Sequence, residues 1–312
     1  MKHKIGLFIP TYNAVENCGD RFRQTLANIA KANLDRVLII DSSSLDNTVQ
    51  LVDSFGFEVQ VIPQSEFDHG GTRQLGLTKL SDCEVVIFLT QDAYIKDVCS
   101  LQCLIQPILN NSDIGATYGR QIAFDDANIF AKYLRMDNYG VESYVLSYPD
   151  RYSYGMRCVF ASNSFAAYNV RKVMQLGGFP EKIILGEDVF IFAKLLIAGY
   201  KVQYVANSLC YHSHNYNIID EFRRYFDIGV FHRTNLWIIE HFNGVESDGF
   251  NYILSEFKYV IRHKPFKIHL SIIKNLAKYI GYKFGHNYLF LSKKMCRKLS
   301  MNKYYWDNEH SV

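Results

Sequence analysis

The stretch RVLIIDSSSLDNT, residues 36–48, joins an apolar run to a cluster of small polar residues. Residues 36–41 have the length and the β-branched content of a buried strand. Asn47 or Thr48 can then cap the helix that VQLVDSF predicts. A buried strand that ends in polar residues and leads into a helix is the unit from which sheets with crossover helices are built.

The same unit recurs on both sides of this stretch. KIGLFIP (4–10), FEVQVIP (57–63), EVVIFLT (84–90) and IGATYG (114–119) predict further strands. Apolar periodicity predicts helices over residues 16–31 and 99–109, the first with Phe22, Leu26 and Ile29 on one face. Strands that alternate with helices at this spacing predict an α/β fold with a mainly parallel sheet flanked by helices.

Polar residues follow each of the first four predicted strands. They are Pro10-Thr11-Tyr12-Asn13, the stretch 41–46, the predicted loop SEFDHGGTRQLGL (65–77), and Thr90-Gln91-Asp92. Ligands of open α/β sheets bind outside the carboxyl ends of the strands, so this rim predicts a binding crevice. The absence of G-x-G-x-x-G and of a P-loop motif argues against a dinucleotide oxidoreductase and a P-loop enzyme.

Composition and charge bound the remaining possibilities. The 312 residues, 48% hydrophobic and 21% charged, suit one large α/β domain with an extension or two small domains. The seven scattered cysteines are typical of reduced thiols in a cytosolic protein. Residues 262–303 hold 11 of the 34 Lys and Arg and none of the 31 Asp and Glu, which indicates an anionic partner for this basic segment.

The second half carries two further polar clusters. Gly177-Gly178-Phe179 is followed by Glu187-Asp188 at the start of a predicted helix, where the helix dipole alone could explain the acids. In YHSHNY, His212 and His214 would face the same side of an extended chain. They are either packed within a loop or available as ligands.

Taken together, these stretches resemble the family 2 glycosyltransferases. The carriers are IPTYNA, IIDSSSLDNT, the acid that ends the fourth strand, and GGFPE with LGED, over about residues 5–214. EFDHGGTRQLG, FLTQDAY, YGRQ, and YHSHNY with EFRRYFDIGVFHR are similar to bacterial rhamnosyltransferases of that family. The resemblance implies a GT-A fold, a Rossmann-like nucleotide-sugar binding architecture, over residues 1–215. Its donor half would be about 1–122, its acceptor half about 123–215, and residues 216–312 would form a helical basic extension.

The resemblance also implies site residues. Asp188 matches the catalytic base, and Glu187 would orient the acceptor or the helix end. Asp92 would bind Mg²⁺ or Mn²⁺ with His214 completing the site, although Thr90-Gln91-Asp92 stands where the wider family has D-x-D. The donor-binding residues that it implies are Pro10, Thr11, Tyr12, Asn13, Asp41, Ser43, His69, Gly70, Arg73, Gln91 and Arg120.

Some positions have a specific expected role, leave alternatives, or depart from the family pattern. Asp41 would accept the N3–H of uracil or thymine. Arg73 would meet donor phosphate, brace Asp92 or form a structural salt bridge. Gln74 stands where the family usually has Asn, which changes a local hydrogen bond. Arg224, after the histidines, would face the diphosphate or lie on a solvated helix surface.

The function that follows is inverting transfer of L-rhamnose from dTDP-rhamnose to a glycan or polyprenyl-diphosphate-linked acceptor in bacterial O-antigen or capsule synthesis. The alternatives are a UDP-sugar donor on the same fold and a catalytically silent nucleotide- or glycan-binding protein. We expect no nucleic-acid partner.

The basic segment predicts where the protein works. Apolar residues and tyrosines alternate with lysines over residues 262–303. They predict helices that either pack their apolar side on the catalytic domain or attach to an anionic membrane surface. We expect a cytoplasmic, peripheral protein on the inner face of the cell membrane, without a spanning helix.

Overall fold

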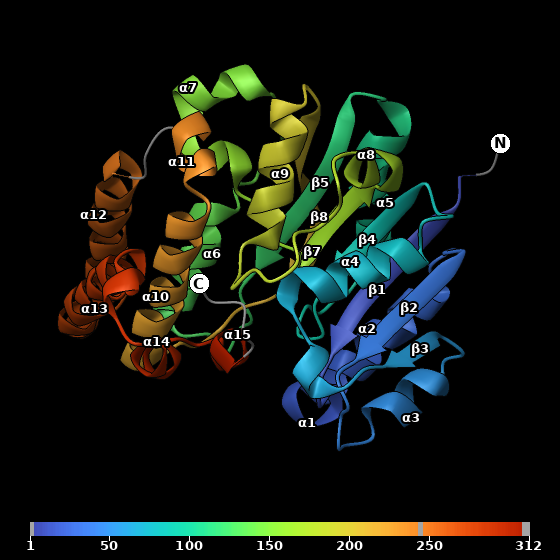
Figure 1. Cartoon of the computed structure of the whole chain (residues 1–312), viewed down its shortest axis with the longest axis horizontal. Helices are drawn as coiled ribbons and strands as arrows, with labels where there is room; N and C mark the ends of the chain where they lie inside the picture. Colours follow the sequence, from blue (N-terminus) through green and yellow to red (C-terminus); the bar gives the residue numbers. More distant parts are fainter. Residues whose placement is uncertain (1–2, 243–245, 308–312) are drawn as a thin grey trace.

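A single eight-stranded sheet runs through the centre of the molecule (Figure 1). The computed structural model describes residues 3–242 and 246–307. The strands are β1 (Ile5–Thr11), β2 (Arg36–Asp41), β3 (Glu58–Val61), β4 (Val85–Leu89), β5 (Ile114–Ile122), β6 (Tyr144–Leu146), β7 (Phe165–Asn169) and β8 (Lys201–Tyr211). Their order across the sheet is β3-β2-β1-β4-β7-β5-β8-β6.

The strand directions bring the carboxyl ends of several strands to the same rim of the sheet. β1 pairs in parallel with β2 and β4, β2 with β3, and β5 with β8. β7 is antiparallel to both β4 and β5, so β5 and β8 run in the same direction as β1. The carboxyl ends of β1, β2, β4 and β8 therefore share one rim. The predicted mainly parallel α/β fold is confirmed, although β7 interrupts the parallel order.

Helices cover both faces of the sheet because the strand residues alternate. Leu7 and Ile9 of β1 face a core with α2 (Asp20–Lys31), α3 (Thr48–Asp53) and α5 (Val98–Asn110). Phe8 faces the opposite core, with α4 (His69–Lys79), α8 (Val170–Gln175) and α9 (Glu187–Ile197). The other helices described before β8 are α1 (Ala14–Cys18), α6 (Ile129–Asn138) and α7 (Arg151–Tyr154), with 3-10 turns η1 (Gln64–Glu66), η2 (Tyr148–Asp150) and η3 (Gly155–Val159).

Two predicted boundaries were wrong for local reasons. The helix predicted over 16–31 is divided into α1 and α2 at Gly19, whose φ of 56° suits glycine. The stretch 65–77 was expected to be a loop, but α4 begins at His69. Asp68 caps that helix by accepting the Gly71 N–H at 2.6 Å. The helix predicted over 99–109 is confirmed as α5.

The segment after β8 is helical, as predicted. It contains α10 (Ile218–Thr234), α11 (Leu236–Phe242), α12 (Glu246–His263), α13 (Ile268–His286), α14 (Lys293–Leu299) and α15 (Lys303–Asp307), with η4 (Pro265–Lys267) and η5 (Tyr288–Phe290). Phe226 and Val230 of α10 and Trp306 of α15 belong to the core that Phe8 faces. The extension therefore packs onto the sheet and its helices, and the division after residue 215 stays a prediction. Among the helices described, none is long and apolar enough to cross a membrane.

Candidate active site

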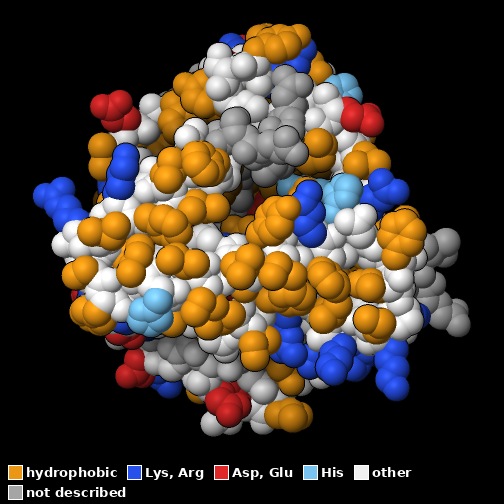
Figure 2. Space-filling view, turned by 90° about the vertical axis from the view of Figure 1, so that its left-hand side faces the viewer, with side chains coloured by type: hydrophobic (Ala, Val, Ile, Leu, Met, Phe, Trp, Pro, Cys, Tyr) orange, Lys and Arg blue, Asp and Glu red, His pale blue; other side chains and the backbone are white. Residues whose placement is uncertain are grey.

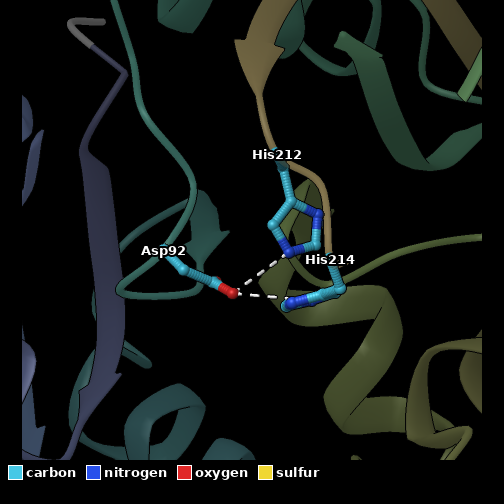
Figure 3. A group of neighbouring side chains, drawn as sticks. All are labelled: Asp92, His212 and His214. Carbon is cyan, nitrogen blue, oxygen red and sulfur yellow. Dashed lines mark hydrogen bonds and ion pairs between the residues drawn. The ribbon is translucent and has the colours of Figure 1, made fainter. Parts of the chain in front are cut away.

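Three side chains from the ends of two strands meet at the rim (Figure 3). Asp92 follows β4, and His212 and His214 follow β8. Reciprocal backbone hydrogen bonds of 2.8 and 2.9 Å between Tyr94 and Tyr211 hold the two segments together. As a result, Oδ2 of Asp92 lies 3.3 Å from Nε2 of His212 and 3.5 Å from Nε2 of His214.

The electrostatics of this cluster suit a cation. Burial alone would raise the pKa of Asp92, but His212 and the Thr90 hydroxyl outweigh it and hold that pKa well below its usual range. Burial, aided by His212, lowers the pKa of His214 to about 4, so its imidazole is neutral at pH 7. A carboxylate beside a neutral imidazole is a donor set for a divalent metal ion.

The contacts behind His212 support the same interpretation. Its Nδ1 lies 2.8 Å from Oε1 of Gln121, and its carbonyl oxygen accepts a 2.7 Å hydrogen bond from Arg135. When Nδ1–H donates to Gln121, Nε2 presents a lone pair to the Asp92 carboxylate. A neutral His212 can thus bind a divalent ion through Nε2 together with the Asp92 carboxylate, since two ligands about 2.1 Å from one ion at right angles lie about 3 Å apart. The described residues thus fit a divalent ion.

The cluster of Asp92, His212 and His214 shares a cavity of about 570 Å³ with Glu187 and Asp188 at the start of α9. The two oxygens of Asp188 accept hydrogen bonds from the backbone N–H groups of Val189 and Asn163, at 2.8 and 3.1 Å. Burial, and then the charge of Glu187, raises the pKa of Asp188 to about 6. A carboxylate with this pKa is ionised at neutral pH and is a better base than an ordinary aspartate.

Glu187 is held in a buried ion pair. Its Oε1 lies 3.1 Å from Nε of Arg73, and both side chains are 6% exposed. Asn163 donates to the same oxygen at 2.9 Å. Although burial acts to raise it, Arg73 brings the pKa of Glu187 below its usual value. Of the predicted alternatives for Arg73, the structure contains the salt bridge, made with Glu187, and the side chain also lines the cavity.

The neighbouring residues of α4 tie the two halves together. Oε1 of Gln74 accepts the Phe179 N–H at 2.8 Å, so the glutamine links α4 to the Gly177-Gly178-Phe179 turn. A Cβ at Gly70 would lie 1.7 Å from the Pro180 carbonyl oxygen. This glycine therefore permits a close approach of the chain to itself. Nε2 of His69 lies 3.2 Å from Oδ1 of Asn302 in the C-terminal segment, while the imidazole also lines the cavity.

The donor-side residues form a hydrogen-bonded rim. Asp41 is fully buried, and its Oδ2 accepts from the hydroxyls of Thr11 at 2.8 Å and Ser44 at 2.6 Å. Tyr12 N–H donates to Gln91 Oε1 at 2.7 Å, and Gln91 Nε2 donates back to the Tyr12 carbonyl at 3.1 Å. These pairs connect the ends of β1, β2 and β4.

The remaining predicted donor residues are placed as follows. Asn13 has a left-handed backbone and its Oδ1 accepts the Leu45 N–H at 2.8 Å. Ser43 donates to the Ile62 carbonyl, Pro10 lies within β1, and Arg120 lies on β5 opposite Leu209. Of these four, none is among the residues that line the cavity.

Sequence reasoning ranked His214 above His212, yet both reach Asp92. The spacing of the two histidines was the available signal. Asn163, whose contacts hold both Glu187 and Asp188, carried no recognisable motif. Arg224 also lines the cavity, with its guanidinium carbon 5.9 Å from the Tyr216 ring centroid, while His214 stacks on Tyr216 at 5.1 Å.

Residues 7–177 match the model of the glycosyl transferase family 2 domain. The chain belongs to glycosyl transferase family 2. It is 42% identical over 308 residues to O-antigen chain rhamnosyltransferase RfbN of Salmonella typhimurium strain LT2, covering 98% of this chain and 96% of that protein. It is 40% identical over 303 residues to O-antigen chain rhamnosyltransferase WbaN of Salmonella anatum, covering 97% and 95%. The protein is therefore a glycosyltransferase, as predicted.

Two solved structures show that the fold is of the GT-A type. The mannosyltransferase PcManGT from Pyrobaculum calidifontis, in complex with GDP-Man and Mn²⁺, has a TM-score of 0.56 at 16% identity, covering 98% of this chain and 86% of that one. S. aureus TarS 1–349 has a TM-score of 0.55 at 14% identity, with 93% of each chain covered. Identities this low support the fold alone.

Proposed function

We propose that the protein transfers L-rhamnose from dTDP-rhamnose, with inversion, to a glycan or polyprenyl-diphosphate-linked acceptor in O-antigen synthesis. The sugar is supported by the identity to two O-antigen chain rhamnosyltransferases over nearly the whole chain. The chemistry is carried by one observation. Asp188, with its raised pKa, and the Asp92 cluster line the same cavity.

Asp188 acts as the general base in this mechanism. Inversion is a displacement in which the acceptor hydroxyl attacks the anomeric carbon from the side opposite the leaving diphosphate. Asp188 accepts the hydroxyl proton as the new bond forms. The backbone N–H groups of Asn163 and Val189 fix both carboxylate oxygens, so the base is oriented before the acceptor arrives.

Asp92, His212 and His214 would hold a divalent ion, whose chemistry when bound is to neutralise charge on the leaving diphosphate. Two imidazole nitrogens favour Mn²⁺ over Mg²⁺, which prefers oxygen ligands. Arg224 lies on the same cavity wall and offers a permanent cation to the diphosphate. Arg73 positions Glu187 and leaves phosphate contact to Arg224.

Asp41 selects the base of the nucleotide. Its carboxylate is fully buried and accepts hydrogen bonds from Thr11 and Ser44, so it accepts the N3–H of thymine or uracil only when the Ser44 contacts move aside. This contact does not distinguish the two bases, so the choice of dTDP over UDP rests on the rest of the donor site. The protein works on the inner face of the cell membrane, where a lipid-linked acceptor would be presented.

Turnover with a donor panel tests the proposal. The enzyme is incubated with Mn²⁺, lipid-linked acceptors and equal concentrations of dTDP-rhamnose, UDP-glucose or GDP-mannose. The release of the nucleoside diphosphate is measured. We expect release from dTDP-rhamnose only when acceptor is present. Faster release from UDP-glucose would establish the alternative donor class. Nucleotide binding in thermal shift without acceptor-dependent release from any donor would support a binding protein instead.

A further inference from the structure

Helix α13 buries its polar side and exposes its apolar side, which is the reverse of a helix on the surface of a soluble protein. Its buried side chains are polar or small, namely Ser271, Lys274, Asn275, Lys278, Gly281 and Gly285. Six of its large apolar side chains, Ile272, Ile273, Leu276, Tyr279, Ile280 and Phe284, are 38% to 60% exposed. Amphipathic helices normally place these two classes the other way round.

Buried polar contacts fix this orientation. Oε1 of Glu256, on α12, accepts hydrogen bonds from Ser271 and, at 2.8 Å, from Asn275, and its Oε2 lies 3.8 Å from Nζ of Lys278. Nζ of Lys274 lies 3.4 Å from Glu221 of α10. Rotating α13 to bury its apolar side would break these hydrogen bonds. It would also leave the buried carboxylates of Glu256 and Glu221 without their partners.

Backbone packing fixes it as well. A Cβ at Gly281 would lie 2.3 Å from the Phe222 carbonyl oxygen, and one at Gly285 would lie 1.9 Å from that of Phe226. Only glycine allows α13 to approach α10 this closely. The large side chains of α13 have no room on that side, so their exposure is built into the fold.

The exposed apolar side chains form a continuous surface. Figure 2 shows a band of hydrophobic side chains across this face of the molecule, with Lys and Arg along its edge. Besides the α13 residues, the exposed hydrophobics near it in sequence are Phe266 in η4 and Leu289 and Phe290 in η5, at 69%, 56% and 88% exposure. We call the outward residues of α13 with Phe266, Leu289 and Phe290 the apolar band. Bands of this size on a soluble protein mark an interaction site.

Charge indicates what covers the band. Residues 262–303, which contain it, have 11 Lys and Arg and no Asp or Glu. Arg262, Lys264, Lys283, Lys293 and Lys294 are exposed. Two copies that met through this segment would oppose like charges, whereas anionic lipid headgroups complement them and acyl chains accept the apolar side chains.

We propose that the apolar band is a lipid-docking surface, on which the protein lies in the interface of an anionic bilayer without crossing it. The apolar side chains enter the headgroup and acyl boundary, and the surrounding lysines contact the headgroups. On its other side α13 contributes Lys274 and Lys278 to the wall of the active-site cavity. The same helix thus separates the bilayer from the cavity. This inference deepens the membrane location in the proposed function by naming the surface and its mode of attachment.

Vesicle sedimentation tests the inference without donor or acceptor, so its result is independent of the sugar transferred. Full-length protein is mixed with vesicles of phosphatidylcholine plus phosphatidylglycerol, or of phosphatidylcholine alone, at low and high salt. The variant Leu276→Glu/Phe290→Glu alters the band. Val61→Glu/Val141→Glu is the matched control, because both valines are exposed, at 53% and 73%, and lie outside the band. Thermal melting confirms that each variant is folded, and gel filtration reports oligomeric state.

Wild-type protein and control should bind the anionic vesicles alike, and high salt should weaken this binding without abolishing it. The band variant should lose about tenfold or more in partitioning, since each side chain gives up the burial of a large apolar group. Equal binding by the folded band variant, or no binding by wild type at low salt, would overturn the inference. So would a wild-type dimer that the band variant converts to a monomer, because a second copy would then cover the band.

Discussion

Replacing Asp188 with Asn should remove activity without weakening the fold. The folded-state pKa of about 6 lies above the ordinary value of 3.8, so this carboxyl stabilises the fold at low pH and loses that contribution as pH rises through about 6. At pH 7.5 the ionised form therefore lowers the free energy of unfolding by about 3 kcal/mol, as worked from the difference between the two pKa values. Asn removes this cost, but it has only one acceptor oxygen for the backbone N–H groups of Asn163 and Val189. The lost hydrogen bond cancels about 1 to 2 kcal/mol of the gain in stability.

The net expectation for Asp188→Asn is unchanged or slightly raised stability, with turnover reduced by about 10²–10⁴-fold through loss of the general base. Urea unfolding at pH 7.5 measures the stability, and acceptor-dependent release of the nucleoside diphosphate measures the turnover. Asp53→Asn, at an exposed position of α3, is the matched control. In the wild type, kcat/KM should fall about tenfold per pH unit below pH 6 as the base becomes protonated. Near-normal turnover in the variant, or an activity loss fully explained by unfolding, would refute the assignment.

Further predictions concern the groups around this base. His212→Ala should weaken Mn²⁺-dependent dTDP binding by at least about tenfold, as measured by calorimetry, while leaving binding without metal unchanged. Equal metal dependence in both proteins would contradict metal binding by the Asp92 cluster. Arg73→Met should lower the free energy of unfolding by about 3 to 5 kcal/mol because Glu187 is left buried without its partner, and a smaller loss than 1 kcal/mol by urea titration would argue against the pair. Asp227→Ala should remove the acceptor for the Ser300 hydroxyl and for two backbone N–H groups of residues 300–302, and limited proteolysis should then cleave the C-terminal segment faster.

Local patterns were sufficient for much of the fold. Apolar runs of strand length predicted β1, β2, β4 and the start of β5, and the polar residues after them marked the rim correctly. The break at Gly19 was missed because the apolar periodicity of 16–31 continues through it, while the backbone there requires a positive φ. The antiparallel direction of β7 was not predicted, since strand direction depends on the connection and not on the strand's own residues.

The site was predictable where a motif lies within one segment, and less so where segments far apart in sequence meet. Asp92 and Asp188 each follow a short recognisable pattern. Arg73 could not be assigned to Glu187 from sequence, because 114 residues separate them and the contact depends on how α4 and α9 pack. The inverted α13 was likewise hidden. Its sequence has both polar and apolar faces, and only the contacts with Glu256 and α10 show which one is buried.

The anomeric configuration of the product tests the inverting mechanism most directly. Wild-type enzyme, Mn²⁺, dTDP-rhamnose and a lipid-linked acceptor are incubated, and the new linkage is assigned by nuclear magnetic resonance from its one-bond carbon–proton coupling. With Asp188 as the base in a single displacement, the rhamnose should have the anomeric configuration opposite to that of the donor, and the Asp188→Asn protein should form little product. A product that retains the donor's configuration would require two displacements and would contradict the role given to Asp188.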